Sequence, residues 1–104
     1  MPQQAIKLTI ITEALLVKDI IKIIEAAGAS GYTLIPASGK GSRDIRSSGQ
    51  PSVSDTFTNI KIEVITPTSE VATQIADQVA SRYFGNYSGI VYRDQIEVLH
   101  AHTL

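Results

Sequence analysis

Two similar heptads, each followed by a segment whose apolar residues have helical spacing, constrain the fold of this chain most. Residues 6–12 read Ile-Lys-Leu-Thr-Ile-Ile-Thr, and residues 60–66 read Ile-Lys-Ile-Glu-Val-Ile-Thr. Both are rich in β-branched residues, which favour strands. Chance similarity between two β-rich segments is an alternative to duplication, but each copy places a strand before a helix at a matching point of the chain.

The first unit is predicted to be a strand over residues 6–11 followed by a helix. Thr12 is a plausible N-cap for this helix, and Glu13 suits its positive N-terminal end. Gly28 is the expected helix stop. The helix presents an apolar stripe at helical spacing that consists of Leu16, Ile20, Ile23, Ile24 and Ala27.

The second unit is predicted to start with a strand over residues 57–65. Thr66 is expected to cap the helix that follows, with Pro67 at its first position, where proline is favoured. Residues 85–89 (Gly-Asn-Tyr-Ser-Gly) are expected to form a tight turn after this helix. The apolar stripe of the helix consists of Val71, Ala72, Ile75, Ala76, Val79 and Tyr83.

Two further strands complete the pattern. Residues 32–35 predict a short strand ended by Pro36, and residues 90–98 predict another, interrupted at residues 93–95 by a bulge or an exposed corner. The order βαββαβ is that of an α+β, ferredoxin-like fold in which two helices cover one face of an antiparallel sheet. Nothing in this chain covers the other face, and if that face is apolar it needs a partner, for which a symmetric homo-oligomer is the commonest solution.

Composition limits the class of protein. A length of 104 residues predicts one domain spanning residues 1–104, and a net charge of −1 argues against broad nucleic-acid binding. Cysteine is absent, which excludes a disulfide framework and a thiol nucleophile. No signal pattern or membrane-spanning apolar run is present, so we expect a soluble, intracellular protein with any membrane role indirect.

The polar stretch at residues 37–56 is the first candidate site. It is rich in glycine and serine and poor in apolar residues, so we expect it to be mobile until it binds something. Arginine suits phosphate, and glycine allows close backbone approach, so an anion-binding loop is indicated. A solvated surface loop is the alternative. The residues expected to hold phosphate are Lys40, Gly41, Ser42, Arg43 and Arg46.

The turn at residues 85–89 is the second candidate site, although a plain helix-to-strand turn would have the same composition. Its expected contacts with phosphate or a base are Tyr87, Ser88 and Gly89. His100 and His102 lack an obvious third ligand, so no metal site is expected. No nucleophile and base stand together in a recognisable motif, so we expect no enzymatic activity.

Several segments resemble the PII signalling superfamily. Residues 28–33 look like the PII segment that enters strand two, and the run Gly-Lys-Gly-Ser-Arg-Asp-Ile-Arg-Ser-Ser-Gly-Gln-Pro at residues 39–51 closely resembles the loop of the SbtB-like proteins of cyanobacteria. Residues 83–92 and 97–103 are also similar to that branch. The resemblance covers nearly the whole chain and is strongest in residues 37–56, which correspond to the segment called the T-loop in PII proteins.

The resemblance implies a homotrimer with ligand sites in the clefts between subunits. Such proteins bind adenine nucleotides (cAMP, AMP, ADP and ATP) as effectors, with no permanently bound cofactor. They act on the sodium-dependent bicarbonate transporter SbtA in the carbon-concentrating mechanism, as cytoplasmic proteins that associate peripherally with the plasma membrane. Some relatives continue into a cysteine-containing loop linked to nucleotide hydrolysis, and this chain has no cysteine. The alternatives are a weak nucleotide hydrolase and a nucleotide-independent assembly module.

Overall fold

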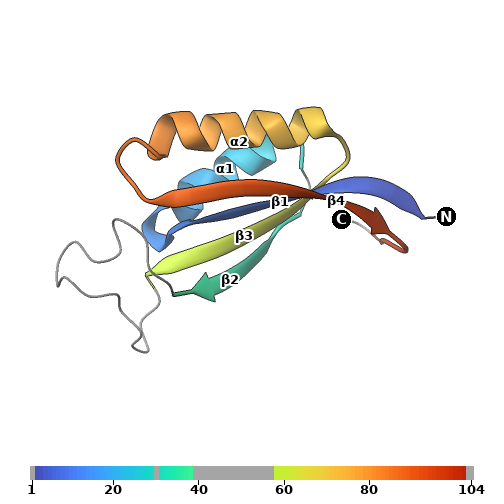
Figure 1. The fold of residues 1–104 in the computed structure, drawn as a ribbon, viewed down its shortest axis with the longest axis horizontal. Coiled ribbons are helices and arrows are strands. Elements are labelled where there is room, and N and C mark those ends of the chain that lie inside the picture. Colours follow the sequence, from blue (N-terminus) through green and yellow to red (C-terminus); the bar gives the residue numbers. More distant parts are fainter. Residues whose placement is uncertain (1, 30, 39–57, 103–104) are drawn as a thin grey trace.

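The computed structural model describes residues 2–29, 31–38 and 58–102. These residues form one four-stranded sheet with the strand order β2-β3-β1-β4, and every neighbouring pair is antiparallel. Figure 1 shows both helices on one face of the sheet. The predicted α+β, ferredoxin-like fold is confirmed. The elements are β1 (Gln3–Glu13), the 3-10 turn η1 (Ala14–Leu16), α1 (Val17–Ala26), β2 (Thr33–Ala37), β3 (Asn59–Thr66), α2 (Ser69–Tyr83) and β4 (Gly89–Val98).

The core lies between the two helices and the central strands β1 and β3. Leu8 and Ile10 of β1 and Ile62 and Val64 of β3 point toward the helices and are almost fully buried. The predicted helical stripes supply the other half of this core, because their central members Ile20, Ile23, Ile24, Ala72, Ile75 and Val79 are all buried there. Each buried Leu, Ile or Val side chain of this core contributes about 1.5–3 kcal/mol.

Both predicted helix caps are wrong. Thr12 and Glu13 belong to β1, where they pair with Ile60 and Asn59 of β3, because the sheet ladder continues two residues beyond the predicted strand. Thr66 likewise ends β3, and its hydroxyl donates to the carbonyl of Ile6 at 3.2 Å. The N-cap of α2 is Thr68, whose Oγ1 accepts a hydrogen bond from the backbone N–H of Val71 at 3.3 Å.

The edge strands also differ from their predicted forms. Pro36 lies within β2 rather than after it, which an edge strand tolerates because one side of its backbone needs no partner. β4 runs without a bulge, since its pairing with β1 is continuous from Val98 opposite Gln3 to Gly89 opposite Thr12. Polar residues 93–95 fit this edge because they reach solvent there. Gly28 ends α1 as expected, with φ of 92°.

Hydrophobic residues are exposed on the sheet face opposite the helices. Ile90 and Tyr92 of β4 lie beside Ile11 and Thr9 of β1 on this face and are 55% and 41% exposed. Thr9 is fully buried among its neighbours, and within the described residues its hydroxyl has no hydrogen-bond partner. The helices of the described part of the chain leave this face uncovered (Figure 1).

Candidate functional site: an anchored turn beside the ends of the long loop

One end of the sheet holds the predicted turn and the described residues on either side of residues 39–57. Strand pairing places Ala37 beside Asn59, Asn59 beside Glu13, and Gly89 beside Thr12. The residues that flank the 37–56 stretch therefore lie at the same end of the sheet as the turn between α2 and β4 (Figure 1). Lys40, Gly41, Ser42, Arg43 and Arg46 themselves lie outside the described residues, so their role as phosphate ligands stays a prediction.

The turn is fixed through Ser88. The hydroxyl of Thr12 donates to the Ser88 carbonyl at 2.7 Å, and the Glu13 carboxylate accepts a hydrogen bond from the Ser88 N–H at 2.9 Å. Thr12 and Glu13 are only 2% and 4% exposed. Both backbone groups of Ser88 thus bond to the end of β1, which fixes the backbone of the turn at this edge.

Packing requires glycine at position 89. A Cβ at this position would lie 2.5 Å from Cζ of Phe84 and 3.0 Å from Oγ1 of Thr12. Tyr87 packs against the core, and its ring meets that of Tyr83 edge-on with centroids 6.5 Å apart. These contacts support the shape of the turn and leave Tyr87 partly buried, so its role as a ligand contact stays a prediction.

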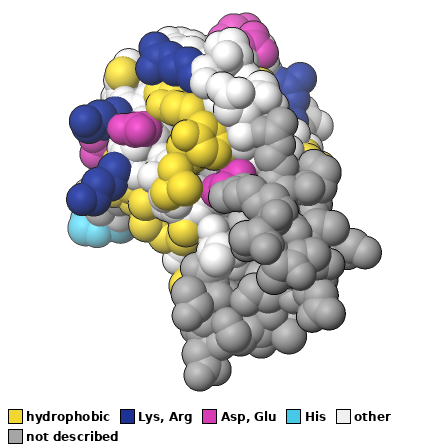
Figure 2. Space-filling model, turned by 90° about the vertical axis from the view of Figure 1, so that its left-hand side faces the viewer, with side chains coloured by type: hydrophobic (Ala, Val, Ile, Leu, Met, Phe, Trp, Pro, Cys, Tyr) yellow, Lys and Arg dark blue, Asp and Glu magenta, His cyan; other side chains and the backbone are white. Residues whose placement is uncertain are grey.

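The surface at this end carries a hydrophobic patch. Figure 2 shows the end of the molecule that bears the turn, with hydrophobic side chains gathered together and charged side chains along one border of them. Exposed apolar groups near this end include Leu15 of η1 and Ile90 of β4. A patch of this kind beside a candidate ligand site is typical of a surface that contacts a partner.

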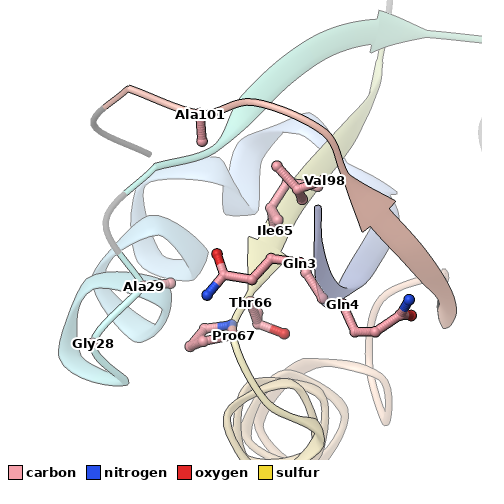
Figure 3. Close-up of a pocket in the computed structure, with 10 residues that line it drawn as sticks. Gln3, Gln4, Gly28, Ala29, Ile65, Thr66, Pro67, Val98 and Ala101 are labelled. Atoms are coloured by element: carbon pink, nitrogen blue, oxygen red, sulfur yellow. The ribbon is translucent and has the colours of Figure 1, made fainter. Parts of the chain in front are cut away.

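A cavity of about 260 Å³ lies at the other end of the sheet. Its wall includes backbone at Gly28 and Ala29, the side chains of Thr66 and Pro67, and the amide of Gln3, which extends toward Ala29 (Figure 3). Its other lining residues are Gln4, Ala5, Ile65, Val98 and Ala101. The sequence did not predict this cavity, because its walls come from segments that lie far apart in the chain and meet only after folding.

The described residues contain neither a metal-binding cluster nor a membrane-spanning helix. There, no three His, Cys, Asp or Glu side chains gather in a way that would hold a metal ion. Neither helix of that part of the chain is long and apolar enough to cross a bilayer.

Solved structures with the same fold include PII-like proteins. A PII-like signaling protein from Thermus thermophilus is 34% identical, with a TM-score of 0.74 over 93% of this chain and 91% of that one. CPII from Thiomonas intermedia K12, bound to ADP and bicarbonate, is 25% identical, with a TM-score of 0.78 over 94% and 91% of the two chains. A further CPII structure at 25% identity, covering 96% and 93% with a TM-score of 0.75, holds ADP, AMP and acetate.

The GlnK–ATP complex of B. subtilis, at 19% identity, shares the fold alone, with a TM-score of 0.54 over 88% of this chain and 82% of that one. The family profile described as Nitrogen regulatory protein P-II matches residues 5–103. The chain therefore belongs to the PII family.

Proposed function

We propose that this protein is a non-enzymatic regulator that senses adenine nucleotides, with AMP, ADP, ATP and cyclic AMP as candidate effectors. Membership of the PII family and the ADP- and AMP-bound structures of CPII support nucleotide binding. The observation that carries the proposal is the gathering of the anchored turn and both flanks of the 37–56 stretch at one end of the sheet.

The binding site is proposed to lie between copies of the chain. From Gln3 to Thr12, β1 extends about 30 Å at roughly 3.4 Å per residue, so the cavity and the turn are too far apart for one nucleotide to touch both. In a cyclic homotrimer the turn of one copy can adjoin the cavity of the next. The largely apolar cavity, with a few polar groups, suits a base, and the turn suits phosphate.

The exposed sheet face supports assembly. Ile90 and Tyr92 leave apolar surface that a neighbouring copy would bury, and the hydroxyl of Thr9 would gain access to a partner group there. A domain of this size buries a smaller share of its surface than a large domain does, which favours such association.

The signal is proposed to be the conformation of the T-loop. Lys40, Arg43 and Arg46 contact the phosphate, aided by Gly41 and Ser42, and nucleotides of different charge select different loop states according to their differential affinity. The strong resemblance of residues 39–51 to SbtB-like proteins supports SbtA, the bicarbonate transporter of the carbon-concentrating mechanism, as the partner. The protein would then be cytoplasmic and peripheral to the plasma membrane.

Titration calorimetry with the four nucleotides tests the proposal. Arg46→Ala is expected to weaken binding by tenfold or more, because a charge-assisted hydrogen bond contributes about 1.5–3 kcal/mol. Lys18→Ala, which removes an exposed basic side chain from α1, is the matched control and leaves the affinity unchanged. Equal affinities of wild type and Arg46→Ala reject the role of Arg46.

The same samples separate the other functions. Metal-dependent release of phosphate from ATP would indicate a hydrolase, and an intact oligomer that binds none of the four nucleotides would indicate an assembly module. Capture of SbtA from detergent-solubilised membranes, with and without each nucleotide, tests the partner. Capture that no nucleotide alters would reject nucleotide control of this interaction.

A further inference from the structure

The last residues of β1 and the first residue of η1 contact both the turn at residues 85–89 and the residue that precedes β3. Thr12 and Glu13 bond to the carbonyl and the N–H of Ser88, as described above. The next residue, Ala14, donates its N–H to the carbonyl of Thr58 at 2.8 Å. Thr58 immediately precedes β3 and so lies where the long connection from β2 rejoins the sheet.

We infer that residues 12–14 couple the ligand-facing turn to the start of β3, with Thr12 and Glu13 as positioning residues for nucleotide binding. The inference rests on the proposed nucleotide function and extends it, because it names the path by which occupancy at the turn reaches the base of the T-loop. Neither side chain needs to touch the ligand.

Thr12 and Glu13 hydrogen-bond to Ser88 from two directions. Successive side chains of a strand point to opposite faces, so Thr12 and Glu13 reach Ser88 from the two sides of the sheet. Both side chains are nearly fully buried and their bonds to Ser88 are partly buried, so the loss of a partner leaves a buried polar group unpaired, which is costly. A shift of the Ser88 backbone must therefore move the end of β1 or break one of the two bonds.

The same segment has little freedom to absorb such a shift. Thr12 and Glu13 are paired to Ile60 and Asn59 on the other side of β1, and Thr12 also pairs with Gly89. A displacement of the turn is consequently passed along β1 to Ala14, whose bond to Thr58 is the next contact. The amide protons of Ser88 and Ala14 report on the two halves of this path.

Variants that keep or remove each bond test the inference. Thr12→Val and Glu13→Leu remove the groups that bond to Ser88, and each is expected to weaken AMP binding about tenfold in calorimetry, as for the loss of one partly buried hydrogen bond. Thr12→Ser and Glu13→Gln keep a hydroxyl donor and an oxygen acceptor, so they should restore most of the affinity. Thr68→Ala loses a capping hydrogen bond in α2 and controls for lost stability alone.

Amide exchange followed by NMR tests the coupling itself. In the wild type, saturation with AMP is expected to slow exchange at both Ser88 and Ala14, whereas in Thr12→Val the response at Ala14 should fall at least threefold at matched saturation. Equal AMP affinity in all variants, or an Ala14 response unchanged in Thr12→Val, would overturn the inference while leaving nucleotide binding in place. Absence of AMP binding by the wild type would overturn both.

Discussion

Substitution of Gly89 by alanine tests the packing of the turn directly. The added Cβ would lie 2.5 Å from Cζ of Phe84, against an ordinary contact distance of 3.4 Å or more, so the ring must retreat by about 1 Å. Phe84 packs against the core, and the new Cβ would also meet Oγ1 of Thr12 at 3.0 Å. Overpacking of this kind typically costs about 1–3 kcal/mol.

Urea denaturation and thermal unfolding measure that cost. For a domain near 100 residues, each 1 kcal/mol lowers Tm by about 4–8 °C, so Gly89→Ala should lower it by at least about 4 °C. Gly85→Ala is the matched control within the same turn, because no atom lies within 4 Å of the Cβ it adds. Its free energy of unfolding should stay within about 0.5 kcal/mol of the wild type.

A double-mutant cycle identifies the source of the strain. If the Phe84 ring is the obstacle, Phe84→Leu should relieve most of the cost of Gly89→Ala, which gives a coupling energy of about 1 kcal/mol or more. The reasoning fails if Gly89→Ala is as stable as the wild type. It also fails if the cost of Gly89→Ala is the same in both backgrounds, because the Phe84 contact would then be irrelevant.

Three other variants test separate parts of the fold. Gly28→Ala should lower the free energy of unfolding in urea by at least about 1 kcal/mol, because a φ of 92° is strained for alanine even though the space around Gly28 is open. An unchanged free energy of unfolding would contradict this. Thr68→Ala should cost about 1 kcal/mol and speed exchange of the Val71 amide, and unaltered exchange would deny the cap. Tyr92→Glu should shift the assembly toward monomers in analytical ultracentrifugation, because it places charge on the exposed sheet face; an unaltered mass would argue against assembly through that face.

Periodicity predicted the elements of this fold because one face of each helix packs on one sheet. Ile20 and Ile24, and likewise Ile75 and Val79, recur four residues apart and are fully buried. Such spacing depends only on local geometry, which the sequence displays directly. The sheet order β2-β3-β1-β4, with β1 and β3 central, is that of the ferredoxin-like fold predicted from the βαββαβ pattern.

The caps were mispredicted because cap residues and tertiary hydrogen bonds use the same chemistry. Thr12 and Glu13 supply the oxygen atoms that a helix N-terminus favours, yet their partner Ser88 lies 76 and 75 residues away in the chain. A local pattern reveals that such a side chain needs a partner and does not reveal which one. The cavity lined by Gln3 and Thr66 went unnoticed for a similar reason, since its walls meet only after folding.

The anchoring of Ser88 has a consequence for ligand selection. A turn already fixed by Thr12, Glu13 and Phe84 has little ordering entropy left to lose, so it can offer the same surface to every adenine nucleotide. Discrimination among AMP, ADP, ATP and cyclic AMP must then come from groups that respond to the number and arrangement of phosphates. Under the proposed function those groups include Arg43 and Arg46. Loss of the Thr12 hydroxyl should therefore weaken all four ligands by a similar factor, whereas loss of either arginine should change the ratios between them.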